Sequence, residues 1–545
     1  MKLLRELTRL QDERGFLDDE MLRALSARMR VPLYRLEGLV SFYPHFRKEP
    51  PPAATVQTCR DVTCAMCGCE SLTQQLREAT NGRTDVEIRE VSCLGRCDTA
   101  PAVAINEEPV ISPSPLQISD ILDLIDDPES VNRLPSSGRN RTWKCNPYAD
   151  EDEHYGTVKS LIASGAEFAT TSIERLKEAG LRGMGGAGFP TGTKWEFVAR
   201  EPNRPKYVIC NADESEPGTF KDRVLLAELP QLVIEGMLLA GLTTGAENGI
   251  VYIRHEYAPE RRALEAAIDA ARAAGILGDN AAGSGQRFDV EIFVSPGGYI
   301  LGEETALLEA LEDKRGEPRN RPPFPSTNGL WGKPTLINNV ETFVLATSIV
   351  HHGAEWWNSQ GAGDYSGLKV ICISGDVERP GVYEIPCGLT VAEVIERAGG
   401  MRGGLPPKAF LPGGASTNFL PAASAETPLD FDALRDAGSA LGTGAVTVFA
   451  EGRDLFALAT NIVRFFRNES CGKCVPCRLG TEQTVGLLED VRAGLVAPSE
   501  LATLAELGET LEQTSICGLG QVALNPILSM LAHFPDEIPQ HAAGG

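Results

Sequence analysis

The sequence predicts an α/β protein of several domains that is helical at both ends and carries clustered candidate metal ligands. Strand-like and helical segments alternate between residues 54 and 450, a pattern typical of α/β domains. Residues 1–48 and 451–545 show helical periodicity alone. Most of the fourteen cysteines gather in three short segments. A chain of 545 residues has room for three to five domains with buried cores.

Composition argues against two classes of partner. The formal net charge of −24 disfavours a nucleic-acid partner on electrostatic grounds. Apolar residues make up 42% and charged residues 23%, which is ordinary for a soluble globular protein. The sequence contains neither an apolar run of about 18 residues nor the apolar core of a signal peptide. We therefore expect a cytoplasmic protein with no direct membrane insertion.

Residues 1–50 form the first predicted segment. Gly15 should end a first helix, and Asp18 and Asp19 suit the start of a second. A proline run at 50–52 marks the boundary with the next domain.

Residues 51–131 predict a small α/β domain with cysteines at the ends of its strands. The expected elements are strands at 55–58 and 86–91, helices at 70–79 and 118–125, and a hairpin within 101–111. Four thiolates from two facing loops suit a [2Fe–2S] cluster, and we assign them to Cys59, Cys64, Cys93 and Cys97. The alternative is the plant-type ferredoxin spacing of Cys59, Cys64 and Cys67. It needs only one further cysteine, so it would leave one of Cys93 and Cys97 without a role. Cys67 and Cys69 are taken as bystanders.

Residues 132–155 are polar and predict a linker across the surface, after which a central domain spans 156–360. Its most distinctive stretch is Gly180–Trp195, GLRGMGGAGFPTGTKW, in which six of sixteen residues are glycine. Such a loop lets backbone N–H groups converge on a ligand, and Lys194 adds a positive charge. The pattern lacks the ending of a Walker loop, but it favours binding of a phosphate group.

Polar segments follow the predicted strands of this central domain. The sequence NADESEPGTFKDR (211–223) begins where a strand at 207–210 ends, and LINNVET (336–342) contains a pair of asparagines. The sequence GGYILGEET (297–305) places two carboxylates at a helix start, which the helix dipole alone could explain. Because ligands bind at the carboxyl ends of parallel strands, these segments predict polar ligand recognition.

The last two predicted segments differ in secondary structure, the first being rich in strands and the second helical. Residues 361–450 predict short strands at 368–374, 382–385 and 445–449, with a helix at 391–398. Residues 451–545 are helical and carry a C-x2-C-x2-C run followed by one later cysteine, and the four are Cys471, Cys474, Cys477 and Cys517. Four thiolates suit a [4Fe–4S] cluster, with tetrahedral zinc as the less favoured alternative.

Taken in order, these motifs resemble those of the respiratory complex I family. Most of residues 156–545 is similar to the NADH-binding, 51-kilodalton-type flavoprotein subunit, and residues 1–131 resemble the 24-kilodalton-type subunit. The resemblance implies a thioredoxin-like [2Fe–2S] domain and a Rossmann-like FMN and NADH domain. A β-grasp, SLBB-like domain with a packing role and a helical [4Fe–4S] domain complete the expected architecture.

The resemblance also implies roles for individual residues. The FMN phosphate would be held by Gly183, Gly185, Gly186 and Lys194. The flavin and its ribityl chain would be held by Asn211, Asp213, Glu214, Gly302, Glu303, Asn338 and Asn339. The adenine of NADH would stack on Phe189, Phe197 and Phe324. The catalytic carboxylates Glu216 and Glu304 would contact the dinucleotide near the nicotinamide, with Tyr299 nearby. Met184 departs from the family pattern, which usually has arginine there, and we expect weaker phosphate anchoring at most.

The function implied is that of a diaphorase subunit that passes electrons between NAD(H), FMN and the two clusters. The [2Fe–2S] cluster would lie on the side of the flavin opposite the [4Fe–4S] cluster. The fusion, Met184 and the short C-terminal region look most like the β subunit of NAD-dependent molybdenum or tungsten formate dehydrogenase. Its partner would be a large pterin-containing catalytic subunit. The diaphorase subunit of a bidirectional [NiFe] hydrogenase, complex I itself, and a non-catalytic electron-transfer scaffold are the alternatives.

Overall fold

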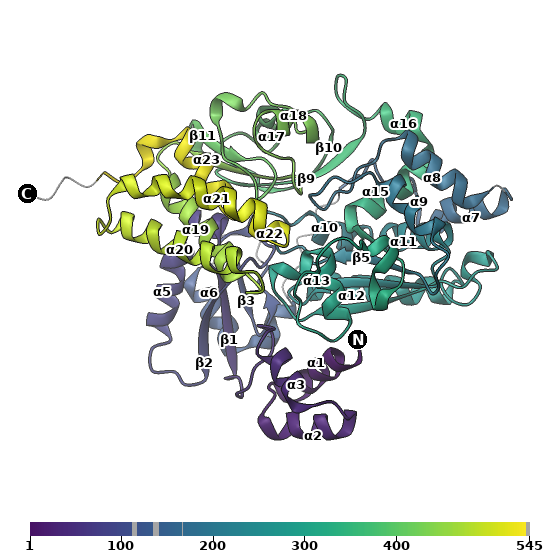
Figure 1. Ribbon diagram of the computed structural model, residues 1–545, viewed down its shortest axis with the longest axis horizontal. Coiled ribbons are helices and arrows are strands. Elements are labelled where there is room, and N and C mark those ends of the chain that lie inside the picture. Colours follow the sequence, from purple (N-terminus) through teal and green to yellow (C-terminus); the bar gives the residue numbers. More distant parts are fainter. Residues whose placement is uncertain (112–116, 134–140, 166, 541–545) are drawn as a thin grey trace, which may run out of the picture.

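The computed structural model describes residues 1–111, 117–133, 141–165 and 167–540. Four parts of the chain pack around a common centre (Figure 1). In that view the N-terminal helices and the first sheet lie below, and the central parallel sheet lies to the right. A mixed sheet lies above, and the C-terminal helices lie to the left.

The N-terminal segment consists of the helices α1 (Lys2–Arg14), α2 (Asp19–Met29) and α3 (Leu33–Val40). Gly15 ends α1 in a left-handed conformation with φ 83°. The side chain of Asp18 caps α2 by accepting a hydrogen bond from the Met21 N–H at 2.7 Å. Both predicted boundary signals are thus confirmed.

The first sheet has the order β2-β1-β3-β4, in which β1 pairs parallel with β2 and antiparallel with β3. Its strands are β1 (Ala54–Cys59), β2 (Val86–Val91), β3 (Val103–Ile105) and β4 (Glu108–Pro109). Its helices are α4 (Val62–Met66), α5 (Cys69–Ala79) and α6 (Ile118–Asp126). The predicted elements of this domain are all present, and the first two strands end beside the predicted cysteine ligands.

The central sheet is wholly parallel, with the order β7-β6-β5-β8. Its strands are β5 (Tyr207–Ala212), β6 (Asn248–Arg254), β7 (Asp289–Ser295) and β8 (Thr335–Asn339). The helices around it are α7 (Gly156–Ala163), α8 (Phe168–Glu178), α9 (Thr191–Arg200), α10 (Lys221–Glu228), α11 (Pro230–Thr244), α12 (Ala258–Ala273), α13 (Glu304–Leu311), α14 (Pro325–Asn328), α15 (Val340–His352) and α16 (Ala354–Asn358). A short 3-10 helix, η5 (Tyr299–Gly302), precedes α13.

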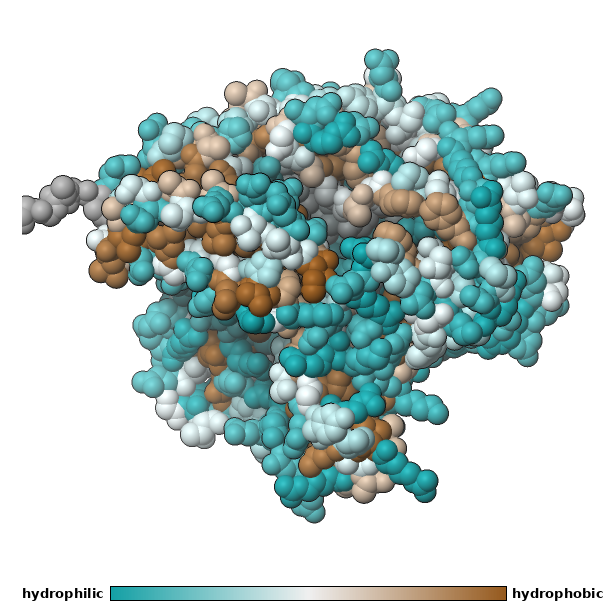
Figure 2. Space-filling view, in the orientation of Figure 1, coloured by the Kyte–Doolittle hydropathy of each residue, from teal (hydrophilic) through white to brown (hydrophobic). Residues whose placement is uncertain are grey.

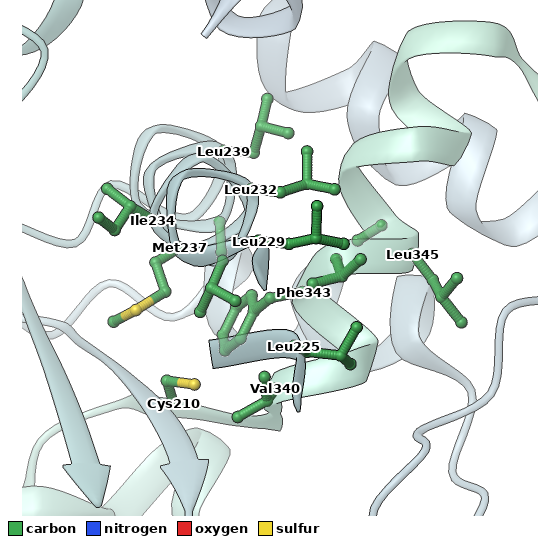
Figure 3. Close-up of a cluster of buried hydrophobic side chains, with 14 of the residues drawn as sticks. Cys210, Leu225, Leu229, Leu232, Ile234, Met237, Leu239, Val340, Phe343 and Leu345 are labelled. Atoms are coloured by element: carbon green, nitrogen blue, oxygen red, sulfur yellow. The ribbon is translucent and has the colours of Figure 1, made fainter. Parts of the chain in front are cut away.

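The core of this domain lies between α11, α15 and the sheet (Figure 3). Leu232 of α11 points toward α15, which carries Phe343 and Val340, and Cys210 of β5 lies below α11. Burial of this apolar surface is the main stabilising contribution to the domain. It also fixes the carboxyl ends of β5 and β8 relative to each other.

No single helix in the described part of the chain is long and apolar enough to cross a membrane. Among the described helices, only α10 and α11 taken together meet the length and composition criteria, and they are bent by 95°.

The predicted surface linker at 132–155 is partly wrong. Residues 134–140 lie outside the described residues, but Trp143, Cys145 and Tyr148 are buried in the core. The indole N–H of Trp143 donates to Glu228 at 2.9 Å. The backbone N–H of Cys145 donates to the carboxylate of Glu384 at 2.8 Å. This segment therefore joins the central domain to the mixed sheet, which its polar composition did not indicate.

The mixed sheet has the order β10-β9-β13-β11-β12, with β9 and β13 parallel and the other pairs antiparallel. Its strands are β9 (Leu368–Gly375), β10 (Gly381–Pro386), β11 (Pro407–Leu411), β12 (Leu420–Pro421) and β13 (Ala445–Ala450). The helices α17 (Val391–Arg397) and α18 (Phe431–Asp436) accompany it. The predicted strands and helix are present, and β11 and β12 are additional.

The C-terminal segment contains the helices α19 (Leu455–Asn468), α20 (Val475–Arg492), α21 (Thr503–Thr514), α22 (Gly518–Val522) and α23 (Asn525–His533). Its core includes Phe465 and Phe466 of α19 and Leu488 of α20. Hydrophobic side chains also gather on the outer face of these helices (Figure 2). The exposed ones include Val475, Leu479 and Leu495.

Candidate functional site

The glycine-rich stretch forms a loop that closes on itself between α8 and α9. The N–H of Gly183 donates to the carbonyl of Phe189 at 2.8 Å, and that of Thr191 donates to Leu181 at 2.8 Å. Gly186 has φ 116°, a backbone conformation that residues other than glycine rarely adopt. A Cβ on Gly185 would lie 3.2 Å from the Cβ of Asn339 at the end of β8. The loop is therefore a narrow backbone cradle against the carboxyl edge of the parallel sheet.

Lys194 lies on α9, directly after this loop. Its ammonium donates to the carbonyl of Ile337 at 3.1 Å and lies 3.9 Å from the carboxylate of Glu304. Glu304 also pairs with Arg321 at 3.0 Å. Because an ammonium has three N–H donors, Lys194 can bind an anion while it holds the edge of β8. The structure thus brings together two predicted site residues that lie far apart in the sequence.

Met184 is buried within the loop, and its backbone N–H donates to the hydroxyl of Thr342 at 2.9 Å. From the sequence we expected Met184 to weaken phosphate anchoring at most. The structure uses its N–H to fasten the loop to α15. A phosphate in this loop would then depend on the other N–H groups of the loop and on Lys194.

Two polar side chains at the end of β5 connect it to neighbouring segments. Asn211 donates through its amide to the carbonyl of Gly302 at 2.8 Å. Asp213 accepts hydrogen bonds from Ser215 at 2.5 Å and from Ser295 at 2.8 Å. Burial raises the pKa of Asp213 to about 6. These contacts bring the ends of β5, β7 and η5 to one place.

Glu214 was expected to hold the flavin, but its carboxylate binds groups of its own chain. It accepts hydrogen bonds from the N–H of Asp222 at 2.9 Å, the N–H of Arg223 at 3.1 Å and the hydroxyl of Tyr257 at 2.9 Å. Burial raises its pKa to about 7. Glu214 therefore supports the start of α10 and the turn that follows β5.

Glu216 is buried and contacts the mixed-sheet domain. Its carboxylate accepts a hydrogen bond from the backbone N–H of Ser416 at 2.8 Å. Gly414 approaches so closely that a Cβ there would lie 2.6 Å from a Glu216 oxygen. Burial raises the pKa of Glu216 to about 7. The loop between β11 and β12 is thus part of the candidate site, whereas sequence reasoning assigned this domain only a packing role.

The segment from Tyr299 to Glu303 connects the site to the C-terminal helices. The backbone N–H of Tyr299 donates to Glu469 at 2.7 Å, and its ring centroid lies 5.1 Å from that of Phe465. Glu303 caps α13 by accepting hydrogen bonds from the N–H of Thr305 at 2.9 Å and of Ala306 at 2.8 Å. Burial raises the pKa of Glu303.

The two asparagines at the end of β8 are held by their neighbours. Asn338 accepts a hydrogen bond from the indole of Trp195 at 3.3 Å. Asn339 caps α15 and donates through its amide to Asp222 at 2.5 Å. The ammonium of Lys221, fully buried, pairs with Asp222 at 2.6 Å. This buried polar network holds the end of β8, which contacts the glycine loop, in a fixed position.

The three predicted aromatic residues lie at the surface. Phe189, Phe197 and Phe324 are 43%, 45% and 54% exposed, unusual values for phenylalanine. The ring centroids of the first two are 6.5 Å apart. Phe324 precedes α14, which packs against α9. The structure thus brings Phe189 and Phe197 together and places Phe324 at the start of a helix that packs against α9, the helix of Phe197, and a planar aromatic group could stack on such exposed rings.

The four cysteines assigned to the first cluster are all buried and close together. The sulfurs of Cys93 and Cys97 lie 3.9 Å apart. Hydrogen bonding to the thiols of Cys59 and Cys97 lowers the pKa of Cys93, and Cys59 also contacts Cys64. Cys67 lies beside Arg402 of the mixed-sheet domain. An all-sulfur donor set from two facing loops fits a [2Fe–2S] cluster.

Arg254 links this cysteine group to the segment that follows β5. Its guanidinium, which is buried, donates both to the backbone carbonyl of Glu214 and to that of Cys93. Arg223 adds an ion pair to Asp98 at 2.8 Å. No local pattern in the sequence indicates either contact, because the partners belong to different domains.

The second cysteine group lies where α20 and α22 begin. Cys477 neighbours Cys474 and Cys471, and Cys517 also neighbours Cys471. Gly520 leaves room for this approach, because a Cβ there would lie 2.9 Å from the Cβ of Cys477. The ammonium of Lys473 donates to the carbonyl of Pro318 at 2.6 Å and brings the loop against the central domain. Four convergent sulfurs fit a [4Fe–4S] cluster.

Comparison with known families agrees with this arrangement. Residues 176–347 match the Nuo51 FMN-binding domain, and residues 457–541 match the iron-sulfur binding region of NADH-ubiquinone oxidoreductase-F. Residues 1–126 match the thioredoxin-like [2Fe-2S] ferredoxin family, and residues 370–417 match the SLBB domain.

Individual relatives extend the match. The chain is 45% identical to an F-type subunit of NADH-quinone oxidoreductase of Rhizobium meliloti (strain 1021) over 388 residues, which cover 71% of this chain and 92% of that protein. It is 40% identical to the F-type subunit of Streptomyces coelicolor over 405 residues, covering 74% and 89% of the two chains. A crystal structure of an NAD+-reducing [NiFe]-hydrogenase in the air-oxidized state superposes with a TM-score of 0.86 and 34% identity, covering 99% of this chain and 94% of that one.

The identity to these F-type subunits, over most of their length, establishes the family. The chain belongs to the F-type flavoproteins of NADH-quinone oxidoreductase, in the complex I family, with a thioredoxin-like [2Fe–2S] region fused ahead of its FMN-binding, SLBB and [4Fe–4S] regions.

Proposed function

We propose that this chain is a diaphorase that exchanges electrons between NAD(H) and its two iron–sulfur sites through FMN. The observation that carries this proposal is that segments at the carboxyl edge of the parallel sheet, where the glycine loop also lies, contact the segments that carry both four-cysteine groups. Arg254 donates to the carbonyls of Glu214 and Cys93, and the N–H of Tyr299 donates to Glu469, two residues before Cys471. Bound FMN supplies the redox chemistry, since a flavin accepts two electrons from a nicotinamide and releases them singly.

The chain's own residues bind and orient the reactants. The N–H groups of the glycine loop and the ammonium of Lys194 would hold the phosphate. Asn211 and Asn338 would present amide groups to the flavin edge from the ends of two adjacent strands. The exposed aromatic rings would stack the adenine. Glu303, which caps α13, keeps the neighbouring wall of the site in place.

Glu216 is the proposed contact of the nicotinamide end of the dinucleotide. Its carboxyl group lies in a buried position where the protonated and ionised forms are nearly balanced at neutral pH. A protonated carboxyl group accepts an anionic dinucleotide without charge repulsion. Glu304, paired with Lys194 and Arg321, would act on the opposite side.

The diaphorase proposal is tested on the full chain after its iron and sulfide have been restored. We expect about one FMN per chain and NADH-dependent reduction of ferricyanide or a viologen dye. Lys194→Ala should release the flavin, whereas the matched control Lys48→Ala, a half-exposed residue paired with Asp19, should retain it. An iron-replete chain that holds no flavin and oxidises no NADH would leave only the scaffold role.

We further propose that its partner is a large molybdenum- or tungsten-pterin subunit that oxidises formate in a cytoplasmic complex. The fused thioredoxin-like region and Met184 in the glycine loop support this partner. The alignments with the two F-type relatives described above cover 71–74% of this chain, whereas residues 1–126 match the thioredoxin-like [2Fe-2S] ferredoxin family. A second candidate is an NAD+-reducing [NiFe] hydrogenase, which the 99% structural coverage favours.

Metal analysis of the complex purified through this chain decides between these partners. Molybdenum or tungsten in stoichiometric amount, with NAD-linked formate oxidation, supports the formate dehydrogenase assignment. Nickel without either metal supports the hydrogenase. A membrane-bound complex with none of the three contradicts both and leaves complex I.

A further inference from the structure

Three potential metal ligands from distant parts of the chain meet outside the sites described so far. His45 follows α3, Glu107 lies in the turn between β3 and β4, and His255 follows β6. One ligand atom from each lies within 4.8 Å of the others. The three residues belong to the N-terminal segment, the thioredoxin-like domain and the central domain. They are separate from the residues assigned to the flavin and iron–sulfur sites.

The two imidazoles carry the strongest sign of a missing partner. The Nδ1 atoms of His45 and His255 are both buried, and neither has a hydrogen-bond partner among the described residues. The Nδ1 of His45 lies 3.2 Å from a carboxylate oxygen of Glu107, but the pair lacks the alignment of a hydrogen bond. The two ring centroids are 4.7 Å apart and the rings are tilted by 46°. Buried polar atoms in proteins are normally partnered, so two adjacent exceptions point to a ligand.

The backbone holds these side chains in place. Glu107 has φ 69° and Asn106 φ 49°, a turn fixed by the hydrogen bond from the Thr55 N–H to the Asn106 side chain at 2.8 Å. A Cβ on Gly297 would lie 2.8 Å from the ring of His255, so only glycine leaves space for that imidazole. The group is therefore assembled by the fold before any ion binds.

We propose that His45, Glu107 and His255 form a binding site for a divalent transition-metal ion, zinc being the ion it fits best. Two imidazole nitrogens and one carboxylate are a common zinc ligand set, whereas calcium and magnesium prefer oxygen ligands. Bonds of about 2.0 Å would draw the ligand atoms to about 3.3 Å from one another. Glu107, whose side chain is 47% exposed, can supply that movement.

A fourth ligand is available close to the site. A carboxylate oxygen of Glu256 lies 3.3 Å from the Nδ1 of His255, although Arg254 already binds this carboxylate at 2.8 Å. Water or Glu256 would complete a tetrahedral site. The ion would fasten the thioredoxin-like domain to the central domain one residue away from Arg254, which contacts both the Glu214 segment and the Cys93 loop. Its role is therefore structural: it fixes the separation of the flavin and [2Fe–2S] sites.

The test uses the full, iron-replete chain and zinc ions alone as the probe. After equilibration with zinc and gel filtration, the zinc and iron per chain are measured. The wild-type chain should retain about one zinc, and His45→Gln and His255→Gln should lose it with unchanged iron content. The matched control His352→Gln, on the exposed end of α15, should retain the ion. Zinc-edge X-ray absorption should report nitrogen and oxygen ligands without sulfur.

Three results would overturn the proposal. These are a wild-type chain that retains no zinc, both histidine variants retaining it like the control, or sulfur ligands at the zinc edge. If a histidine variant fails to fold, Glu107→Gln replaces it, because this half-exposed side chain can change without disturbing the core. That variant should bind zinc at least about tenfold more weakly, and unchanged affinity would contradict the assignment.

Discussion

Replacing Glu216 by glutamine tests how this chain binds NADH. Glu216 is only 7% exposed, and burial raises its pKa from 4.5 to about 7. Its carboxylate accepts a hydrogen bond from the Ser416 N–H at 2.8 Å. A glutamine side chain has nearly the same shape and keeps an oxygen acceptor for that N–H, but it carries no charge at any pH. The variant therefore isolates the effect of ionisation.

The expected size of the effect follows from this pKa. If the anionic dinucleotide binds the protonated form, about one chain in eleven is competent at pH 8, whereas most are competent at pH 6. The KM for NADH should then rise about tenfold over this range in the wild-type chain, equivalent to about 1.4 kcal/mol. In Glu216→Gln the same KM should change by less than about twofold, because no charge appears as pH rises.

The assay is steady-state reduction of ferricyanide by NADH at pH 6, 7 and 8. Glu235→Gln is the matched control, because burial also raises the pKa of Glu235 to about 7. Glu235 lies on α11 and binds Tyr148, away from the glycine loop. The control should keep the wild-type rise in KM. A wild-type KM that does not change with pH, or an equal rise in Glu216→Gln, would refute the reasoning.

The remaining predictions concern the flavin, the two clusters and the folded state. Lys194→Arg should retain more FMN than Lys194→Ala, because it keeps the charge, and equal flavin loss in both would contradict a charge role. Cys67→Ser should preserve the low-temperature EPR signal of the reduced [2Fe–2S] centre and Cys93→Ser should abolish it; the reverse pattern would support the plant-type ligand set. Cys517→Ser should remove about four irons per chain and leave the [2Fe–2S] signal. The raised pKa of Glu235 means that its carboxyl group holds a proton more tightly in the folded chain than in the unfolded chain. Rising pH therefore lowers the free energy of unfolding, and this loss of stability begins above pH 4.5 and is complete above about pH 7. It reaches on the order of 3 kcal/mol, so Glu235→Gln should lose less thermal stability between pH 5 and 8 than the wild-type chain does.

Local patterns in the sequence were enough to locate most of the fold. A short run of apolar residues placed a strand at 207–210, and β5 spans Tyr207–Ala212. Cysteine spacing grouped the candidate ligands of both clusters, and the structure brings each group together. The glycine loop and the asparagines of β8 also meet, because the carboxyl ends of parallel strands share one edge. These features depend on neighbouring residues or on a known topology.

The features that were missed depend on contacts between domains. Ser416 binds Glu216 across 200 residues of sequence, and no local pattern marks either residue as the partner of the other. The polar composition of 132–155 indicated a surface linker, but Trp143 and Tyr148 are buried there because Glu228 and Glu235 provide partners for their polar atoms.

Anaerobic titration of the purified full chain with NADH tests the central claim most directly. Our account predicts that NADH bleaches the flavin absorbance and that the EPR signals of reduced iron–sulfur clusters appear in the same sample. Both changes should be absent in a Lys194→Ala chain that has lost its flavin. Clusters that dithionite reduces but NADH leaves oxidised, in a chain that holds its FMN, would contradict the claim that this protein is a diaphorase.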